Sequence, residues 1–267
     1  MSGNFEEIIE KMIAAIDAGE YQKAADGAKK CIKLEPENPE GHFFLGEALV
    51  GLDRSQEAIA AYEAGLKLSP EDTDALTSLG DIYFEQGHHK DALNIYQKIV
   101  QIDPKDADGY VNIGLVYNSM ERAEDAIKAY NSALELDPEN VFAYNALGDA
   151  WYGLGNREKA IEAFNKGIAV DPHDAAAHFN LGELYYDLGE HDDAERECLE
   201  SIRLDPEFTL AYLTLGSLHM DREHLSEAVK YLKLYLRYEK SPQAQEMIDE
   251  VKAVIEGLKE ELESKKK

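Results

Sequence analysis

The chain has 267 residues, with 54 Asp and Glu against 27 Lys and Arg, and a formal net charge of -27. This excess of acids argues against nucleic acid or an anionic membrane as partner, because both require clustered Lys and Arg. No run of 18 or more apolar residues occurs, so we expect no membrane insertion and a cytoplasmic location.

A pattern of 34 residues recurs along the chain. In residues 141–174 it places Gly148 at position 8, Ala160 at position 20 and Pro172 at position 32. The same residue types return at these positions in Gly46, Gly80, Gly114, Gly182 and Gly216, in Ala24, Ala58, Ala92, Ala126, Ala194 and Ala228, and in Pro36, Pro70, Pro104, Pro138 and Pro206. A fixed period of this kind predicts stacked units that share one continuous core.

Taken in order, the chain begins with residues 1–4, which we expect to be a flexible start. Seven repeats follow, at 5–38, 39–72, 73–106, 107–140, 141–174, 175–208 and 209–242. The first departs from the pattern, with Lys11 and Met12 where later repeats have an apolar residue and then Gly. The last has Lys240 at position 32, so we expect its second helix to run two residues longer.

Apolar residues recur at helical spacing after the seventh repeat, including Met247, Val251, Ile255 and Leu258. We therefore expect residues 243–263 to form an amphipathic helix that caps the last repeat. Residues 264–267 form a short basic tail.

Each repeat is predicted to form two helices. Positions 4, 7, 8 and 11 of the first helix fall within one arc of about 100°. Gly at position 8 disfavours helix by about 1 kcal/mol, so its recurrence indicates close approach by a neighbouring helix. Gly87, Gly155 and Gly189 suit the turn between the two helices, and the proline at position 32 ends the second.

With these glycines, alanines and prolines at a 34-residue period, residues 5–242 resemble seven tetratricopeptide repeats. The resemblance implies an all-α, right-handed α-solenoid superhelix of antiparallel helix pairs, with the first helix of each pair lining a concave groove. It also implies a non-enzymatic scaffold that binds a peptide or another protein in that groove.

The groove positions are strongly acidic in repeats 2 to 6. Positions 1–14 of these repeats contain no Lys or Arg, and their acids all fall at position 2, 9 or 13. These acids are Glu40, Glu47, Asp74, Asp81, Glu85, Asp108, Asp149, Glu183 and Asp187. We interpret them as a surface for a basic or amphipathic segment, although acids at position 9 also serve solubility.

Aromatic and amide side chains share the same arc. Candidate anchors for a ligand, with core packing as the alternative for each, are the aromatics Phe43, Phe84, Phe142, Tyr152, Phe179 and Tyr186. Asn112, Asn145 and Asn180 loosely resemble the asparagine ladder of the O-linked N-acetylglucosamine transferase repeats, which grips a peptide backbone. Whether the ligand is extended or helical stays open.

The sequence offers no catalytic or metal-binding motif, so we expect no enzyme activity, no cofactor and no metal. His42 and His178 fall on the packing arc and are predicted to be partly buried, and Cys31 and Cys198 are predicted to be packing residues. The competing function is self-assembly into homo-oligomers through the terminal repeats, with Tyr231, Tyr235 and Tyr238 of repeat 7 as the place to look.

Overall fold

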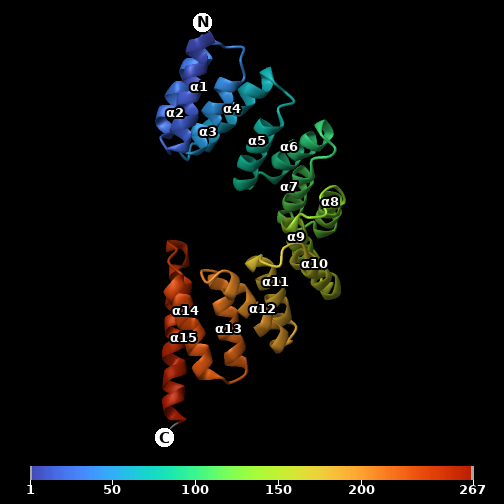
Figure 1. Cartoon of the computed structure of the whole chain (residues 1–267), viewed down its shortest axis with the longest axis vertical. Helices are drawn as coiled ribbons and strands as arrows, with labels where there is room; N and C mark the ends of the chain where they lie inside the picture. The colour runs from blue at the N-terminus through green and yellow to red at the C-terminus, as the bar shows by residue number, and fades with distance from the viewer. Residues whose placement is uncertain (1, 266–267) are drawn as a thin grey trace. The chain divides into compact units, whose positions relative to one another are not determined.

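The computed structural model describes the backbone of residues 2–265 and the side chains of residues 5–265 (Figure 1). Within these residues the chain is helical, with no strand. It divides into two compact units, residues 1–136 and 137–267. Unit 1 contains α1 (Ser2–Asp17), α2 (Tyr21–Leu34), α3 (Glu40–Val50), α4 (Ser55–Leu68), α5 (Thr73–Glu85), α6 (His89–Ile102), α7 (Ala107–Ser119) and α8 (Ala123–Leu136). Unit 2 contains α9 (Val141–Gly153), α10 (Arg157–Val170), α11 (Ala175–Asp187), α12 (His191–Leu204), α13 (Thr209–Asp221), α14 (Leu225–Tyr238), a 3-10 turn (Pro242–Ala244) and α15 (Gln245–Ser264).

The helices pack as successive antiparallel pairs, so each unit is an α-solenoid. We call the odd-numbered helices α1 to α13 the A helices and the even-numbered helices α2 to α14 the B helices. Each A helix packs most extensively on the B helix that follows it, and α15 packs on α14. The predicted all-α solenoid class is confirmed.

Side chains at fixed positions begin and end these helices. Asp72, Asp106, Asn140 and Asp174 cap α5, α7, α9 and α11, each accepting a backbone N–H of the first helical turn. The A-to-B turn contains one residue with positive φ in every pair, namely Gly19, Asp53, Gly87, Glu121, Gly155, Gly189 and Glu223. Gly87, Gly155 and Gly189 are therefore the turn residues that the sequence indicated.

The glycine at position 8 meets the residue at position 24 of its own repeat. A Cβ atom at Gly148 would stand 2.4 Å from Cε1 of Phe164, and the same clash recurs between Gly80 and Tyr96. The B helix thus lays a large side chain across the glycine of the A helix, as the recurrence of glycine predicted. In the first pair the large residue lies on the A helix and the glycine on the B helix. Met12 of α1 fills the space beside Gly27 of α2.

The two ends of the chain differ in part from expectation. The helix α1 begins at Ser2, so it includes residues 2–4 of the segment that the sequence set apart from the first repeat. The helix α14 ends at Tyr238 and has the same 14 residues as the other B helices, so the expected extension is wrong. Val251 and Ile255 of α15 are 5% and 4% exposed and join the core formed by α11 to α14. Of the basic tail, Lys266 and Lys267 lie outside the described residues.

Candidate functional site

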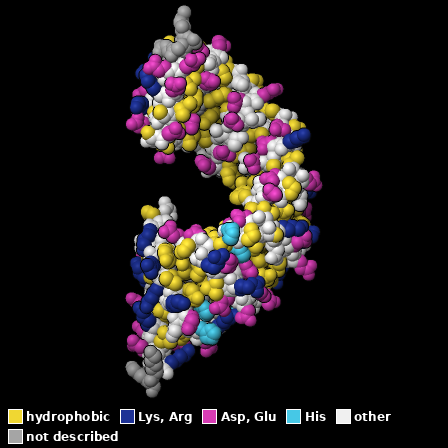
Figure 2. Space-filling model, viewed as in Figure 1, with side chains coloured by type: hydrophobic (Ala, Val, Ile, Leu, Met, Phe, Trp, Pro, Cys, Tyr) yellow, Lys and Arg dark blue, Asp and Glu magenta, His cyan; other side chains and the backbone are white. Residues whose placement is uncertain are grey.

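The acids that the sequence singled out all lie on the exposed side of the A helices, which we call the A-helix face. It comprises the exposed side of α3, α5 and α7 in unit 1 and of α9, α11 and α13 in unit 2. Glu40, Glu47, Asp74, Asp81, Glu85, Asp108, Asp149, Glu183 and Asp187 are all exposed. None of these six helices contains a Lys or Arg. Acidic side chains are also spread widely over the visible surface of both units (Figure 2).

In unit 1, a tyrosine from the B helix reaches an acid of the A-helix face. The ring of Tyr96 passes over Gly80, and its hydroxyl donates a hydrogen bond of 2.6 Å to Oδ1 of Asp81. Burial and this carboxylate both raise the pKa of Tyr96. Burial raises the pKa of Tyr62 in the preceding repeat, and the charges of Glu47 and Asp81 add to this effect. The glycine at position 8 therefore also lets a tyrosine hydroxyl reach an acid of the A-helix face.

In unit 2, Asp149 lacks such a phenol, because Phe164 occupies position 24 of its repeat. Partial burial of the carboxyl group and the negative charge of Glu183 on the next A helix raise the pKa of Asp149 to about 6. Burial, followed by the charge of Asp187, also raises the pKa of Glu183. In unit 1, burial and the charge of Asp17 raise the pKa of Glu47. A cation placed at these carboxylates would relieve the repulsion between them.

Tyrosines and aspartates link neighbouring A helices at the rim of this face in unit 2. Tyr152 of α9 donates a hydrogen bond to Asp187 of α11, and Tyr186 of α11 donates one of 2.8 Å to Asp221 of α13. Burial and the bond to Asp221 raise the pKa of Tyr186 to about 12. These bonds fix the spacing of the three helices and leave Asp187 already paired with a donor.

The predicted aromatic anchors differ in their accessibility. Tyr152 is 41% exposed, whereas Phe43, Phe84 and Tyr186 are half-buried. Phe179 is 6% exposed and packs against Phe208, with ring centroids 5.1 Å apart. It belongs to the core of unit 2, so its proposed place in a binding surface is wrong. The ring of Phe142 is 56% exposed at the start of α9.

The three asparagines are half-buried, and only part of the ladder lies within one unit. Asn112 belongs to unit 1, while Asn145 and Asn180 belong to unit 2. The amide nitrogen of Asn145 donates a hydrogen bond of 3.1 Å to Asp174, the residue that caps α11. Asn145 therefore already links α9 to the start of α11.

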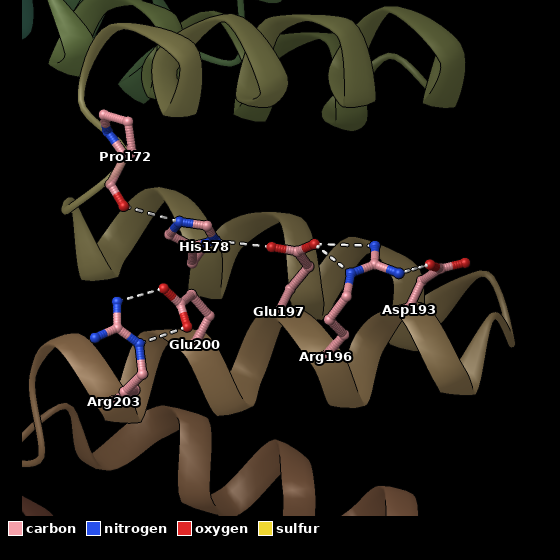
Figure 3. A network of polar contacts seen from close by, with 7 residues as sticks. All are labelled: Pro172, His178, Asp193, Arg196, Glu197, Glu200 and Arg203. Carbon is pink, nitrogen blue, oxygen red and sulfur yellow. Dashed lines mark hydrogen bonds and ion pairs between the residues drawn. The ribbon is translucent and has the colours of Figure 1, made fainter.

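A polar network lies between α11 and α12 (Figure 3). His178 Nδ1 is 2.7 Å from Oε2 of Glu197, and His178 Nε2 is 3.3 Å from the carbonyl oxygen of Pro172. The His178 side chain is 10% exposed and that of Glu197 is 12% exposed. The prediction of a buried, satisfied histidine is confirmed, and the network joins the two helices of one repeat.

Two of the three tyrosines considered for self-assembly are buried within the chain itself. Tyr231 and Tyr235 are 9% and 2% exposed and pack in the core that Val251 and Ile255 of α15 complete. Tyr238 stacks on Tyr212, with ring centroids 5.6 Å apart. Tyr231 and Tyr235 are therefore not accessible to a second copy, whereas Tyr238 is half-buried.

Cysteine packing follows the prediction. Cys31 and Cys198 are both free and fully buried. Burial raises the pKa of Cys198 to about 12, so the reactive thiolate is disfavoured.

Among residues 2–265, no helix is long and apolar enough to cross a membrane.

Three family models match the sequence. One described as "Tetratricopeptide repeat" matches residues 10–72 and 48–107, and a second with the same description matches residues 175–208. A third, described as "TPR repeat", matches residues 114–155 and 148–189. The search of curated protein sequences found no match to this chain.

Solved structures show the same fold. A tetratricopeptide repeat protein from Parabacteroides merdae is 22% identical, with a TM-score of 0.74 over 94% of this chain and 98% of that one. MamA from Desulfovibrio magneticus is 26% identical, with a TM-score of 0.59 over 64% of this chain and 96% of that one. YrrB, described as a TPR protein with an unusual peptide-binding site, is 22% identical, with a TM-score of 0.54 over 70% of this chain and 97% of that one.

Proposed function

The chain belongs to the tetratricopeptide repeat family, and from this premise we propose that it is a non-catalytic scaffold whose A-helix face binds a basic or amphipathic segment of another protein. The observation that carries the proposal is the charge of this face. Its helices contain no Lys or Arg, while Asp149, Glu183 and Glu47 have raised pKa values because they are partly desolvated near other acids.

Electrostatics explain why a cation is the preferred occupant. Like charges held on one surface focus a negative potential, and that potential both attracts and orients a basic ligand. A Lys or Arg side chain between Asp149 and Glu183 would replace their repulsion with two attractions. Phosphate groups or acidic peptides would meet the opposite sign of potential.

Exposed rings on the same face supply the apolar part of the contact. Tyr152 and Phe142 of α9 are 41% and 56% exposed. A guanidinium group stacks well on such rings, and an amphipathic segment can bury its apolar side chains against them. The hydrogen bond from Tyr152 to Asp187 holds the first ring in place beside the acids.

The test is titration of a Lys- and Arg-rich peptide, with a Glu-rich peptide of equal length for comparison, at low and at high salt. The proposal expects the basic peptide alone to bind and its affinity to fall as salt rises, because salt screens charges over about 8 Å at physiological strength. Replacing Glu47 and Asp81 with Lys should weaken binding. The same change at Glu63 and Glu162, which lie on the B helices α4 and α10, should have little effect. Preference for the acidic peptide would refute the proposal.

A further inference from the structure

A pocket of about 570 Å³ lies between α1 and α2, away from the A-helix face of α3, α5 and α7. Ile8, Met12 and Gly27 line it, and the side chain of Met12 occupies the place where a Cβ atom of Gly27 would stand. Lys11, Lys23 and Lys30 line its rim. The pocket thus joins an apolar floor to a cationic edge.

Lysines outnumber carboxylates among the residues that line the pocket. Three lysines stand against one carboxylate, Asp26, which accepts a hydrogen bond of 3.1 Å from Gln22. Lys11 and Lys23 form exposed ion pairs with Glu7 and Glu20, and such exposed pairs are weak enough to exchange for a new partner. Figure 2 shows basic side chains on the edge of unit 1 over α1 and α2. The chemistry of the pocket fits a helix that is apolar and acidic on one face.

The chain itself exposes such a face on α15. Met247 and Val254 are 44% and 39% exposed, although Val251 and Ile255 of the same helix are buried. Residues seven apart on a helix lie on one side of it, and Glu250 lies between these two on that same side. Glu250 is exposed, and no ion pair joins it to another described residue.

We propose that the pocket between α1 and α2 binds the Met247–Val254 face of α15 from a second copy of this chain. Met247 enters this pocket between Ile8 and the lysine rim, where a flexible thioether side chain fills irregular space well. Glu250 meets the lysine rim. This inference is independent of the ligand proposed for the A-helix face, and it replaces the buried tyrosines of α14 as the place where copies meet.

The contact joins different surfaces of the two copies, so it is heterologous. Each bound copy still offers a free pocket or a free α15, and association continues head to tail unless it closes into a ring. An interface of about one helix face is small, so the association is weak, reversible and sensitive to salt.

The experiment uses the full chain and sedimentation velocity at low and high salt. A pocket variant carries Lys11→Glu with Lys30→Glu, and a helix variant carries Met247→Lys with Glu250→Lys. The wild-type protein should show a mass that grows with concentration, with an association constant about tenfold lower at high salt. Each variant alone should remain monomeric. A charge-matched control, Lys67→Glu with Lys128→Glu, changes exposed lysines of α4 and α8 and should associate as the wild type does.

Mixing the two variants gives the decisive result. The pocket variant keeps an intact α15 and the helix variant keeps an intact pocket, so the mixture should form a 1:1 heterodimer and nothing larger. If circular dichroism shows that the pocket variant is unfolded, the helix variant alone must abolish association. A wild type that stays monomeric at low salt, a folded pocket or helix variant that associates like the wild type, or a mixture of folded variants that stays monomeric overturns the inference. Binding of a basic peptide to the A-helix face should be unchanged in both variants, so that a failure here leaves the proposed function intact.

Discussion

The hydroxyl of Tyr96 donates a hydrogen bond of 2.6 Å to the carboxylate of Asp81 in the same repeat. The ring reaches this acid by crossing Gly80, so one small residue on the A helix serves both packing and the charge of the exposed face. The repeat with Asp149 has the same glycine, but Phe164 replaces the tyrosine and the acid keeps no phenol donor.

Adding the missing hydroxyl should lower the pKa of Asp149. The change Phe164→Tyr places a phenol where Tyr96 has one, and a hydrogen bond to the carboxylate favours the ionised form. The carboxyl resonance of Asp149, followed by NMR against pH, should titrate near 6 in the wild type and at lower pH in the variant. Unchanged titration of Asp149 in the variant would show that a phenol at this position does not act on the acid.

Asp149 should also make stability depend on pH. The folded protein raises its pKa to about 6 from 3.8, so folding favours the protonated form. The contribution of Asp149 to the free energy of unfolding is therefore fully present below its unfolded pKa and is lost as pH rises to about 6. Asp149→Asn removes the titration. The melting temperature of the variant minus that of the wild type should therefore become more positive as pH rises from about 4 to about 7. A constant difference across this range would contradict the cause assigned to the shift.

The close contact between Gly148 and Phe164 should be visible in unfolding experiments. Gly148→Ala places a Cβ atom 2.4 Å from a ring carbon, and the overpacking should cost about 1–3 kcal/mol. Gly153→Ala in the same helix meets nothing within 4 Å and should be neutral or slightly stabilising. Equal midpoints in urea for the two variants would mean that the ring of Phe164 is elsewhere.

Two valines of α15 test whether this helix caps unit 2. Val251→Asp buries a charge in the core and should cost more than about 2 kcal/mol, because Val251 is 5% exposed. Val254→Asp is the matched control on the same helix, at a residue that is 39% exposed, and should change the stability of the monomer little. Thermal melting at low protein concentration distinguishes the two. Similar losses in both would show that α15 is not seated as described.

The network between α11 and α12 offers a comparison within one helix (Figure 3). Glu197→Ala leaves the buried ring of His178 without its carboxylate and should cost about 1–3 kcal/mol. Glu200→Ala removes only an exposed pair with Arg203 and should cost less than about 1 kcal/mol. Chemical denaturation measures both, and a larger loss at Glu200 would contradict the assigned roles.

The sequence predicted most of the fold, because the constraints that define it recur at fixed positions. The glycine at Gly148 indicated close packing, and Phe164 provides it. The repeat also predicted that the acids lie together on the A-helix face, since helical periodicity places positions 2, 9 and 13 on one side of the helix.

Other features depended on contacts with the segments that join successive helix pairs, which periodicity does not specify. Phe179 lies at the edge of the exposed arc and packs against Phe208, the residue that precedes α13. Asn145 is held by Asp174, a capping residue 29 positions later. The positive φ of Asp53, Glu121 and Glu223 is also hidden from a search for glycine, although their shared position with Gly87 could have revealed it.

The most direct test of the binding surface compares two neutralised pairs in unit 2. Asp149→Asn with Glu183→Gln removes two charges from the A-helix face, and Glu158→Gln with Glu162→Gln removes two from the B helix α10. Calorimetric titration with a Lys- and Arg-rich peptide at low salt should show affinity about tenfold weaker for the first variant and nearly unchanged for the second. Equal losses in the two variants would contradict the account, because binding would then follow net charge rather than the A-helix face.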